Sequence, residues 1–311
     1  MYIFALDNNK KTNTQSSMKK ILLTGVMMLV ALTIGAQIKV TPKIKKGDKK
    51  TYVVETNSRI GDNDFKVTTE TLIEVKDATA EGFIIEASVV DNKFNSDTTN
   101  IMGKVMALTT NLMKNVHTAY VTDKNGQVLR LLDYEQSKKQ AEEMITKLLG
   151  SVQIPDIVPK DMIVKNAMSN MTEEALMNNV RMNNSPLALN GKTISGETTD
   201  EFNTKEGIRM KRTYSVNSDG SIQSVANMNM SQEDIIQVLV KMTSGMFPDQ
   251  GDAVKDQITQ MVKSGMLKLT ATDKAKYTLG KDGWVDTIEG ETVTECMGQS
   301  TTVTTYVKRK K

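Results

Sequence analysis

Strict alternation of apolar and polar residues near the start of the chain constrains the fold more than any other feature. Tyr52–Ile60, Phe65–Val75 and Phe83–Val89 each place their apolar residues on one side with a two-residue period. A strand of this kind packs one face against a core and leaves the other in water, which is typical of antiparallel sheets. The residues between these stretches, 61–64 and 80–82, have the composition of turns.

The period then changes to that of a helix. Apolar residues fall at helical spacing over 100–116, and a hairpin with a turn at Lys124-Asn125-Gly126 follows. Asp133 is placed to cap a further helix that ends at Gly150. Residues 161–182 form a methionine-rich, interrupted helical region.

The same order recurs in outline in the second half. A hairpin over 208–230 leads to Ser231 and Asp234, which have the spacing of a capping box and open a helix. A further helix follows Pro248, and strands resume from Leu267 to Arg309. No repeat of fixed period occurs, which excludes solenoids and propellers.

This order predicts an α+β fold with a large curved antiparallel sheet, an open half-barrel, and helices packed on its concave face. We expect one domain from residue 37 to residue 311. The alternative is two smaller α+β domains divided near residues 184–186. Each of those would leave long exposed sheet edges.

The beginning of the chain predicts export. After a polar stretch at residues 1–17, Lys19 and Lys20 precede an uncharged apolar run of 14 residues, and small residues end at Ala36. This is the pattern of a secretory signal peptide over 18–36 with cleavage after Ala36, and the run is shorter than the ~20 residues of a membrane span. Residues 1–17 are best explained by a start codon assigned too early. We expect a periplasmic or extracellular protein of a Gram-negative bacterium, with no transmembrane segment in the mature chain.

Charge gives no reason to expect a nucleic-acid partner. Removing four lysines and one aspartate with the first 36 residues leaves 36 basic and 36 acidic residues. A chain without net charge has no field that attracts polyanions. Its single cysteine, Cys296, cannot form an internal disulfide.

Counting also excludes several catalytic classes. His117 is the one histidine, so a Ser-His-Asp triad and any site with two histidines are excluded. We expect no pairing of His117 with Cys296, no metal and no cofactor. Carboxylates are numerous enough for a hydrolase, but aromatic residues make up only 5% of the chain. We expect Trp284 to close a hairpin.

Three short motifs have simple structural interpretations. Asn190–Thr198 contains Gly-Lys-Thr without the first glycine of a phosphate-binding loop, and we expect a turn. Residues 62–74 resemble a calcium loop without its glycine, and we expect a strand. Thr98 and Thr287 follow aspartate as in bacterial O-glycosylation sites, although plain turn and strand residues explain both.

Methionine is the unusual component. The chain has 21 methionines against 6 phenylalanines, and 17 of the methionines follow residue 36. Methionine fills irregular gaps in cores and also lines adaptable binding surfaces. Core packing is the plain interpretation of the stripe, and a wall for a lipid or acyl chain is the functional one. The candidate ligand-binding residues are Met102, Met106, Met113, Met242, Met246 and Met261.

The order of elements resembles that of LolA/LolB-type lipoprotein carriers, whose half-barrels bind lipid. The segment KKGDKKTYVVETN also resembles the first strand of uncharacterised exported proteins of Gram-negative bacteria, preceded by a Lys-Gly turn. Both resemblances concern pattern, so no functional residue is transferred. They imply a non-enzymatic role in binding a hydrophobic ligand.

We therefore expect an exported protein, not an enzyme, that binds a lipid-like ligand between helices and sheet. The alternative is an interaction or structural module of the cell envelope with no small-molecule ligand, which would bind a protein partner through an exposed strand edge. A carboxylate hydrolase is a third hypothesis.

Overall fold

The chain divides into two compact units, Met1–Gln37 and Ile38–Lys311. The fold and the site belong to the second unit. The predicted leader and the segment before it lie outside the described residues. The computed structural model describes residues 37–61, 63–99, 101–114, 116–151, 164–165, 168, 171–181, 185–196, 198–204, 207–244, 251–296 and 298–311.

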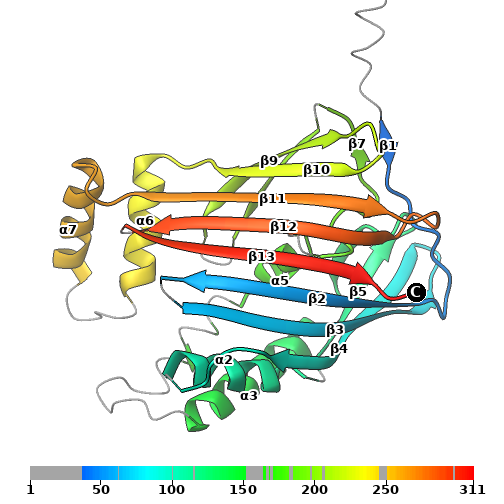
Figure 1. Ribbon diagram of the computed structural model, residues 1–311, viewed down its shortest axis with the longest axis horizontal. Coiled ribbons are helices and arrows are strands. Elements are labelled where there is room, and N and C mark those ends of the chain that lie inside the picture. The colour runs from blue at the N-terminus through cyan, green and yellow to red at the C-terminus, as the bar shows by residue number, and fades with distance from the viewer. Residues whose placement is uncertain are drawn as a thin grey trace, which may run out of the picture. The chain divides into compact units, whose positions relative to one another are not determined.

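The strands form one sheet of 11 and a separate ribbon of 2, all antiparallel (Figure 1). The strand order in the sheet is β6-β5-β4-β3-β2-β13-β12-β11-β10-β9-β8, and the ribbon pairs β1 with β7. The strands are β1 (Ile38–Lys39), β2 (Lys49–Ile60), β3 (Asn63–Ala78), β4 (Gly82–Phe94), β5 (His117–Asp123), β6 (Val128–Leu131), β7 (Thr193–Ile194), β8 (Thr199–Asn203), β9 (Arg209–Val216), β10 (Ile222–Met228), β11 (Leu269–Leu279), β12 (Val285–Cys296) and β13 (Gln299–Arg309).

The predicted fold class is confirmed. The sheet is open, because β6 and β8 are its two edge strands. It is also curved, and helices pack on its concave face (Figure 1). Strands before and after residues 184–186 belong to the same sheet of 11. The helices are α2 (Ile101–Leu112), α3 (Tyr134–Ser151), α5 (Glu173–Arg181), α6 (Gln232–Ser244) and α7 (Gly251–Lys263).

The alternation seen in the sequence produces the inner face of the sheet. Residues paired directly across antiparallel strands lie on the same face, so one row of partners can be followed over five strands. Each member of that row except Val54 is fully buried. The row is Val54, Val307, Ile288, Tyr277 and Ile222.

Irregular pairing accompanies the curvature of the sheet. The register shifts between Glu70 and Thr71 and between Val75 and Asp77 where β3 meets β4, and again between Thr278 and Leu279 on β11. An extra residue in one strand bends that strand and increases its twist. These shifts therefore help the sheet to curl.

Helix α5 lies between the two edges of the curled sheet. It packs against β6 at one edge and β8 at the other. Its first residue, Glu173, accepts a hydrogen bond from the backbone N–H of Leu131 on β6 at 3.2 Å, which satisfies a donor of an edge strand. Val180 of α5 belongs to the same core cluster as Leu131 and Tyr214. That cluster contains residues of strands from both halves of the sheet and forms the main core on the inner side of the sheet.

The other helices given above form two separate groups within the described part of the chain. Helix α2 packs against β4 and α3, whereas α6 and α7 pack against each other (Figure 1). Ile235 and Val238 of α6 rest on Met210 and Leu269 at the inner face of the sheet. None of the helices within the described residues is long and apolar enough to span a membrane.

The helix starts follow the predicted caps. The Asp133 carboxylate accepts from the N–H of Gln136 at 3.0 Å, and Ser231 and Asp234 each accept from the other's N–H at 3.2 Å. The predicted end at Gly150 is wrong by one residue. Helix α3 runs to Ser151, whose hydroxyl donates to the Lys147 carbonyl at 2.8 Å and satisfies an acceptor of the last turn.

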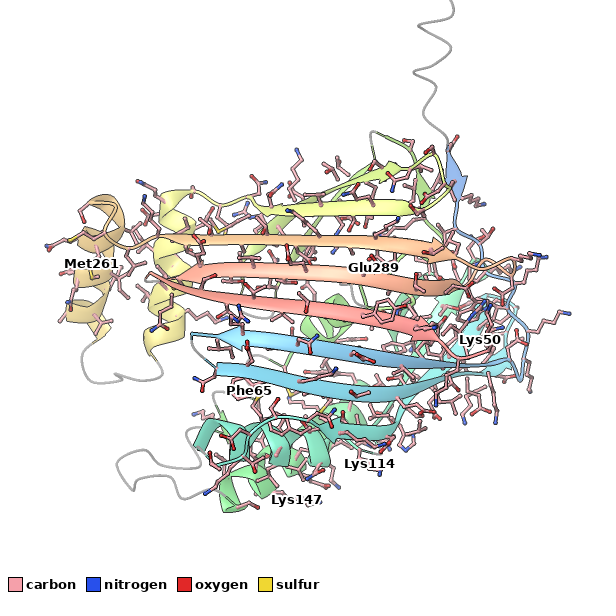
Figure 2. The ribbon with its side chains drawn as sticks, in the orientation of Figure 1. Lys50, Phe65, Lys114, Lys147, Met261 and Glu289 are labelled. Atoms are coloured by element: carbon pink, nitrogen blue, oxygen red, sulfur yellow. The ribbon has the colours of Figure 1, made fainter. Side chains whose placement is uncertain are left out.

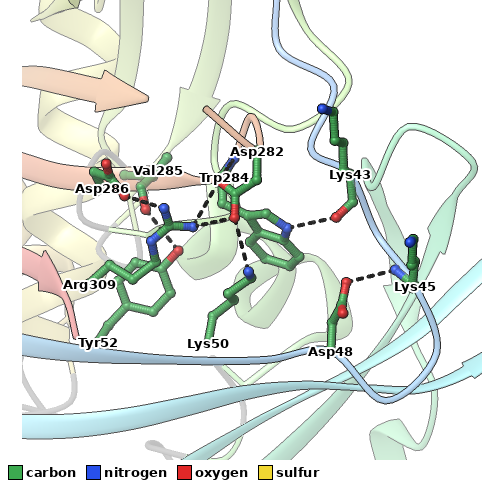
Figure 3. Close-up of polar contacts among 10 residues, drawn as sticks. All are labelled: Lys43, Lys45, Asp48, Lys50, Tyr52, Asp282, Trp284, Val285, Asp286 and Arg309. Carbon is green, nitrogen blue, oxygen red and sulfur yellow. Dashed lines mark hydrogen bonds and ion pairs between the residues drawn. The ribbon is translucent and has the colours of Figure 1, made fainter. Parts of the chain in front are cut away.

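A polar network joins strand ends around the turn before β12 (Figure 3). Trp284 is fully buried in this turn and donates from Nε1 to the Lys43 carbonyl at 3.1 Å, so its predicted role in closing a hairpin is confirmed. The Asp282 carboxylate accepts from Arg309 Nη1 at 2.8 and 2.9 Å and from Lys50 Nζ at 3.0 Å. Burial raises the pKa of Asp282, but these hydrogen bonds outweigh it and hold the pKa below its usual range.

We expect Asp282→Asn to lower the free energy of unfolding by about 1–2 kcal/mol near pH 7, since it removes a charged acceptor shared by two cations. A depressed folded-state pKa gives stability above the unfolded value, and this is lost as the pH falls through the folded value. The gap between wild type and variant should therefore close below about pH 4. Urea unfolding at several pH values measures it.

Asp64→Asn is the matched control. Asp64 pairs with Arg59 at 2.8 Å, but both side chains are 69% exposed. An exposed pair contributes little. A loss of stability in this control equal to that in Asp282→Asn would contradict the assigned role of the network.

Candidate functional site

Residues with catalytic or metal-binding chemistry are the first candidates for a site. Within the described residues, no group of three or more histidine, cysteine, aspartate or glutamate side chains could hold a metal ion. His117 lies on β5 with Nδ1 at 2.8 Å from the Ser88 hydroxyl, while Cys296 lies on β12, and four strands separate β5 from β12 in the sheet. Burial raises the pKa of the Cys296 thiol, which disfavours the nucleophilic thiolate.

The candidate methionines fall into two groups. Met102 and half-buried Met106 lie on α2, and Met113 follows that helix with 38% of its surface exposed. Met261 lies on α7, at the end of the sheet away from Lys50 (Figure 2).

Met242 lies on α6, and Met246 lies outside the described residues. Met261 packs against the cluster of Ile236, Leu239 and Ile258 between α6 and α7. The two groups sit on helices that pack against different partners, and a ligand role for these methionines stays a prediction.

A cavity lies where the two edges of the sheet approach α5. Its volume is about 280 Å³, and we call it the seam cavity. The exposed residues Gln127 and Glu201 mark its mouth. It is lined by Gln127, Val128, Val180, Leu187, Ala188, Asn190, Lys192, Asp200, Glu201, Phe202 and Arg212.

The loop before β7 supplies one wall of the seam cavity. Leu187, Ala188, Leu189 and Asn190 are four successive residues that are each at most 5% exposed. The loop is fixed at its end because the N–H of Gly191 donates to the Val40 carbonyl at 2.8 Å, beside the β1–β7 ribbon. The turn predicted over Asn190–Thr198 is confirmed at Asn190 and Gly191, whereas Thr193–Ile194 within it form β7. The region is buried because it pairs with the distant strand β1.

Asn190 is the unusual member of this wall. It is 2% exposed, and neither Oδ1 nor Nδ2 of its side chain has a hydrogen-bond partner within the described part of the chain. A buried polar group without a partner costs about 1–3 kcal/mol of stability. Such a group in a native protein calls for an explanation, and a ligand or an ordered water in the adjoining cavity is one.

A charged cluster forms the opposite wall. Alternation along β9 turns Arg212 and Tyr214 inward, and Arg212 faces Asp200 of β8 across the strand pair. The Asp200 carboxylate accepts from the Tyr214 hydroxyl at 2.9 Å and from Lys192 Nζ. That hydroxyl accepts in turn from Lys192 Nζ at 2.9 Å and from Arg212 Nη1 at 3.0 Å.

Arg212 is the most buried charge of the cluster. Its side chain is 1% exposed, and its guanidinium carbon lies 4.2 Å from the centre of the Phe202 ring. Burial lowers the pKa of Arg212, but the Tyr214 and Tyr277 phenols and the Asp200 carboxylate more than offset it, so the pKa is raised. Arg212 therefore remains a cation, and burial raises the pKa of Tyr277 beside it well above its usual value.

The seam cavity thus has an apolar side and a polar side. Val128, Val180 and Leu187 provide methyl groups, and the Lys192–Asp200–Arg212 cluster and Asn190 provide donors and charge. This is the usual lining of a small-molecule site, in which apolar walls carry a few polar groups that fix orientation. One feature of the sequence indicates this site, since the alternation in RMKRTYSV places Arg212 on the inner face of its strand.

Comparison with known proteins gives no family. No family model matches the chain, and no curated protein matches it. A solved structure of lipovitellin, described for its lipid–protein interactions, is similar over 86% of this chain with 9% identity and a TM-score of 0.39. The match covers 25% of the lipovitellin chain, so this chain spans about a quarter of that protein's length. At this TM-score the likeness carries no argument about function.

Proposed function

We propose that the protein is an exported, non-enzymatic binding protein that holds a lipid-like ligand between helix α5 and the edges of the sheet. The observation that carries the proposal is the seam cavity, whose apolar side comes from β6, α5 and the loop before β7. Export is proposed from the signal-peptide pattern of residues 18–36.

The size of the seam cavity limits the ligand. At about 30 Å³ for each non-hydrogen atom, the share of one water molecule in the liquid, the cavity holds about nine such atoms. A volume of about 280 Å³ is just below the usual range for ligand sites, about 300–1,000 Å³. A short acyl chain with its head group fills it, and a longer chain would extend through the mouth beside Gln127 and Glu201.

The proposal includes no chemical step. The charged groups of the lining are Lys192, Asp200, Glu201 and Arg212, and three of them share one cluster of hydrogen bonds and ion pairs. Groups held in this way are suited to orienting a ligand.

Filling the seam cavity should prevent binding. Ala188 is 5% exposed in its wall, and Ala188→Leu adds three carbon atoms to that space. We expect octanoic acid to bind wild type in isothermal titration calorimetry and Ala188→Leu at least about tenfold more weakly, which corresponds to about 1.4 kcal/mol. Val128→Leu fills the same space from β6, should Ala188→Leu disturb the loop.

Ala253→Leu is the matched control, because Ala253 is exposed on α7 and the substitution is the same. It should bind like wild type. Native mass spectrometry of protein purified from its host should also find a bound lipid-like molecule. An empty protein that binds neither octanoic acid nor octanol contradicts the proposal.

A second candidate is the interaction module that uses a strand edge. Edge strand β6 and the residue after it carry two exposed leucines, Leu129 at 51% and Leu132 at 44%. An edge strand with exposed apolar side chains can pair with a strand of a partner. A single stoichiometric partner that is lost in Leu129→Lys, together with an empty seam cavity, would favour this candidate over the first.

A further inference from the structure

The seam cavity contains two features that a purely apolar ligand would leave unused. We infer that it takes the head group of a hydroxy acid, a carboxylate with a hydroxyl close to it, while the attached chain lies on the apolar side. This inference rests on the proposed function and names the class of ligand for the same site.

The first feature is the side-chain amide of Asn190. Both of its polar atoms are buried without a partner within the described residues, and Asn190 is one of the residues that line the seam cavity. An amide needs an acceptor for Nδ2 and a donor for Oδ1. A carboxylate oxygen provides the acceptor and a neighbouring hydroxyl provides the donor, so a hydroxy acid satisfies both ends.

The second feature is the charge of the lining. Of its charged side chains, Lys192, Arg212 and Asp200 are each no more than 32% exposed, and together they carry one net positive charge. Glu201 stands apart because it is exposed and its Oε1 accepts from Asn229 at 3.2 Å. A ligand with a single negative charge balances the inner side of the cavity.

Lys192 has donor capacity for that charge. Its ammonium has three N–H groups, and the contacts of the described residues engage it with the Asp200 carboxylate and the Tyr214 hydroxyl. The third N–H remains for a ligand oxygen. A cavity of about 280 Å³ is narrow enough for one head group to reach both Lys192 and Asn190.

Other head groups fit less well. A phosphate monoester carries about two negative charges near neutral pH and would leave the buried charges negative in sum. An alcohol can engage Asn190 but leaves the positive charge unbalanced. A plain carboxylate balances the charge but leaves Oδ1 of Asn190 without a donor.

A ligand series of constant chain length tests this ranking. We expect β-hydroxyoctanoic acid to bind wild type tightest in isothermal titration calorimetry. Octanoic acid should bind a few-fold to about tenfold more weakly, and octanol a further tenfold or more, in line with one neutral and one charged hydrogen bond. Octyl phosphate should bind more weakly than octanoic acid.

The outcomes separate the inference from the proposed function. Equal affinity for hydroxy acid, acid and alcohol overturns the head-group inference and leaves an apolar binding site. Tighter binding of octyl phosphate than of either acid also overturns it. Failure of all four ligands to bind overturns the proposed function itself.

The substitution Asn190→Leu distinguishes a ligand-binding role of Asn190 from a purely structural one. Leucine has a similar shape and no polar atoms, so the empty variant should unfold at the same temperature as wild type or higher. It should lose the preference for the hydroxy acid over octanoic acid. Asn227→Leu, at an exposed position on β10, is the control and should keep that preference. A destabilised Asn190→Leu that keeps the preference overturns the inference, and the ligand series on wild type decides independently.

Discussion

Trp284→Ala is expected to lower the free energy of unfolding by about 3–5 kcal/mol, the usual loss when a fully buried aromatic side chain is truncated. The indole packs in the main core cluster together with Tyr52 and Val285. Its Nε1 also fixes the Lys43 carbonyl in the segment that leads into β2. The substitution therefore creates a cavity and frees that segment at the same time. Urea unfolding followed by circular dichroism measures the loss.

Two controls separate the parts of this effect. Trp284→Phe keeps most of the apolar surface and removes the N–H donor, so we expect a loss of about 1–2 kcal/mol. Tyr306 lies on β13 with 40% of its surface exposed, and Tyr306→Ala should cost well under half of the Trp284→Ala loss. Equal losses for Trp284→Ala and Tyr306→Ala would show that the tryptophan does not hold the end of the sheet together.

Arg212→Ala is expected to cost about 3 kcal/mol, because it removes a buried cation from its carboxylate and phenol partners and leaves a cavity. The guanidinium lies beside the Phe202 ring, donates to the Tyr214 hydroxyl and pairs with Asp200 through Nε at 3.8 Å. A double-mutant cycle with Asp200→Ala should give a coupling energy of about 1–3 kcal/mol. The same unfolding measurement provides all four values.

Arg59→Ala is the control for this prediction. Arg59 pairs with Asp64 on the exposed surface of β2 and β3, so its removal should change stability little. A coupling energy near zero between Arg212 and Asp200 would contradict the account of the charged cluster. The ligand affinity of the site would then depend on Lys192 and Asn190.

The sheet could be predicted from the sequence because the alternation of apolar and polar residues along a strand shows which of its faces is buried. Phe65 and Tyr52 stand at alternating positions that are buried, and the change to helical spacing after residue 100 marks the first helix. The caps at Asp133 and Ser231 were also readable, since capping is decided by residues three apart. Local rules of this kind need no knowledge of the rest of the fold.

The seam cavity could not be predicted, because it depends on contacts between distant segments. Strands β6 and β8 are far apart in the chain, and both pack against α5. Asn190 sits in what the sequence identifies as a plain turn, and its burial follows from the pairing of β1 with β7. An inward arginine such as Arg212 was visible in the alternation, but its partner Asp200 depends on the register of an edge strand.

The methionine pattern was visible in the sequence, but it fits two different roles. Met106 and Met261 each lie at helical spacing from apolar residues of their own helix. This pattern is compatible with a ligand wall and with ordinary helix packing. Met261 packs between α6 and α7, and Met113 is partly exposed beyond the end of α2. The polar wall built by Lys192 and Asn190 gives the more specific hypothesis for a ligand.

Nuclear Overhauser contacts between bound β-hydroxyoctanoic acid and a methyl-labelled protein test the seam cavity most directly. The account predicts contacts from the ligand chain to the methyl groups of Val128, Val180 and Leu187. Contacts to Ile258 and Leu267 between α6 and α7 instead, or a ligand that saturates the protein without touching the first three residues, would contradict it.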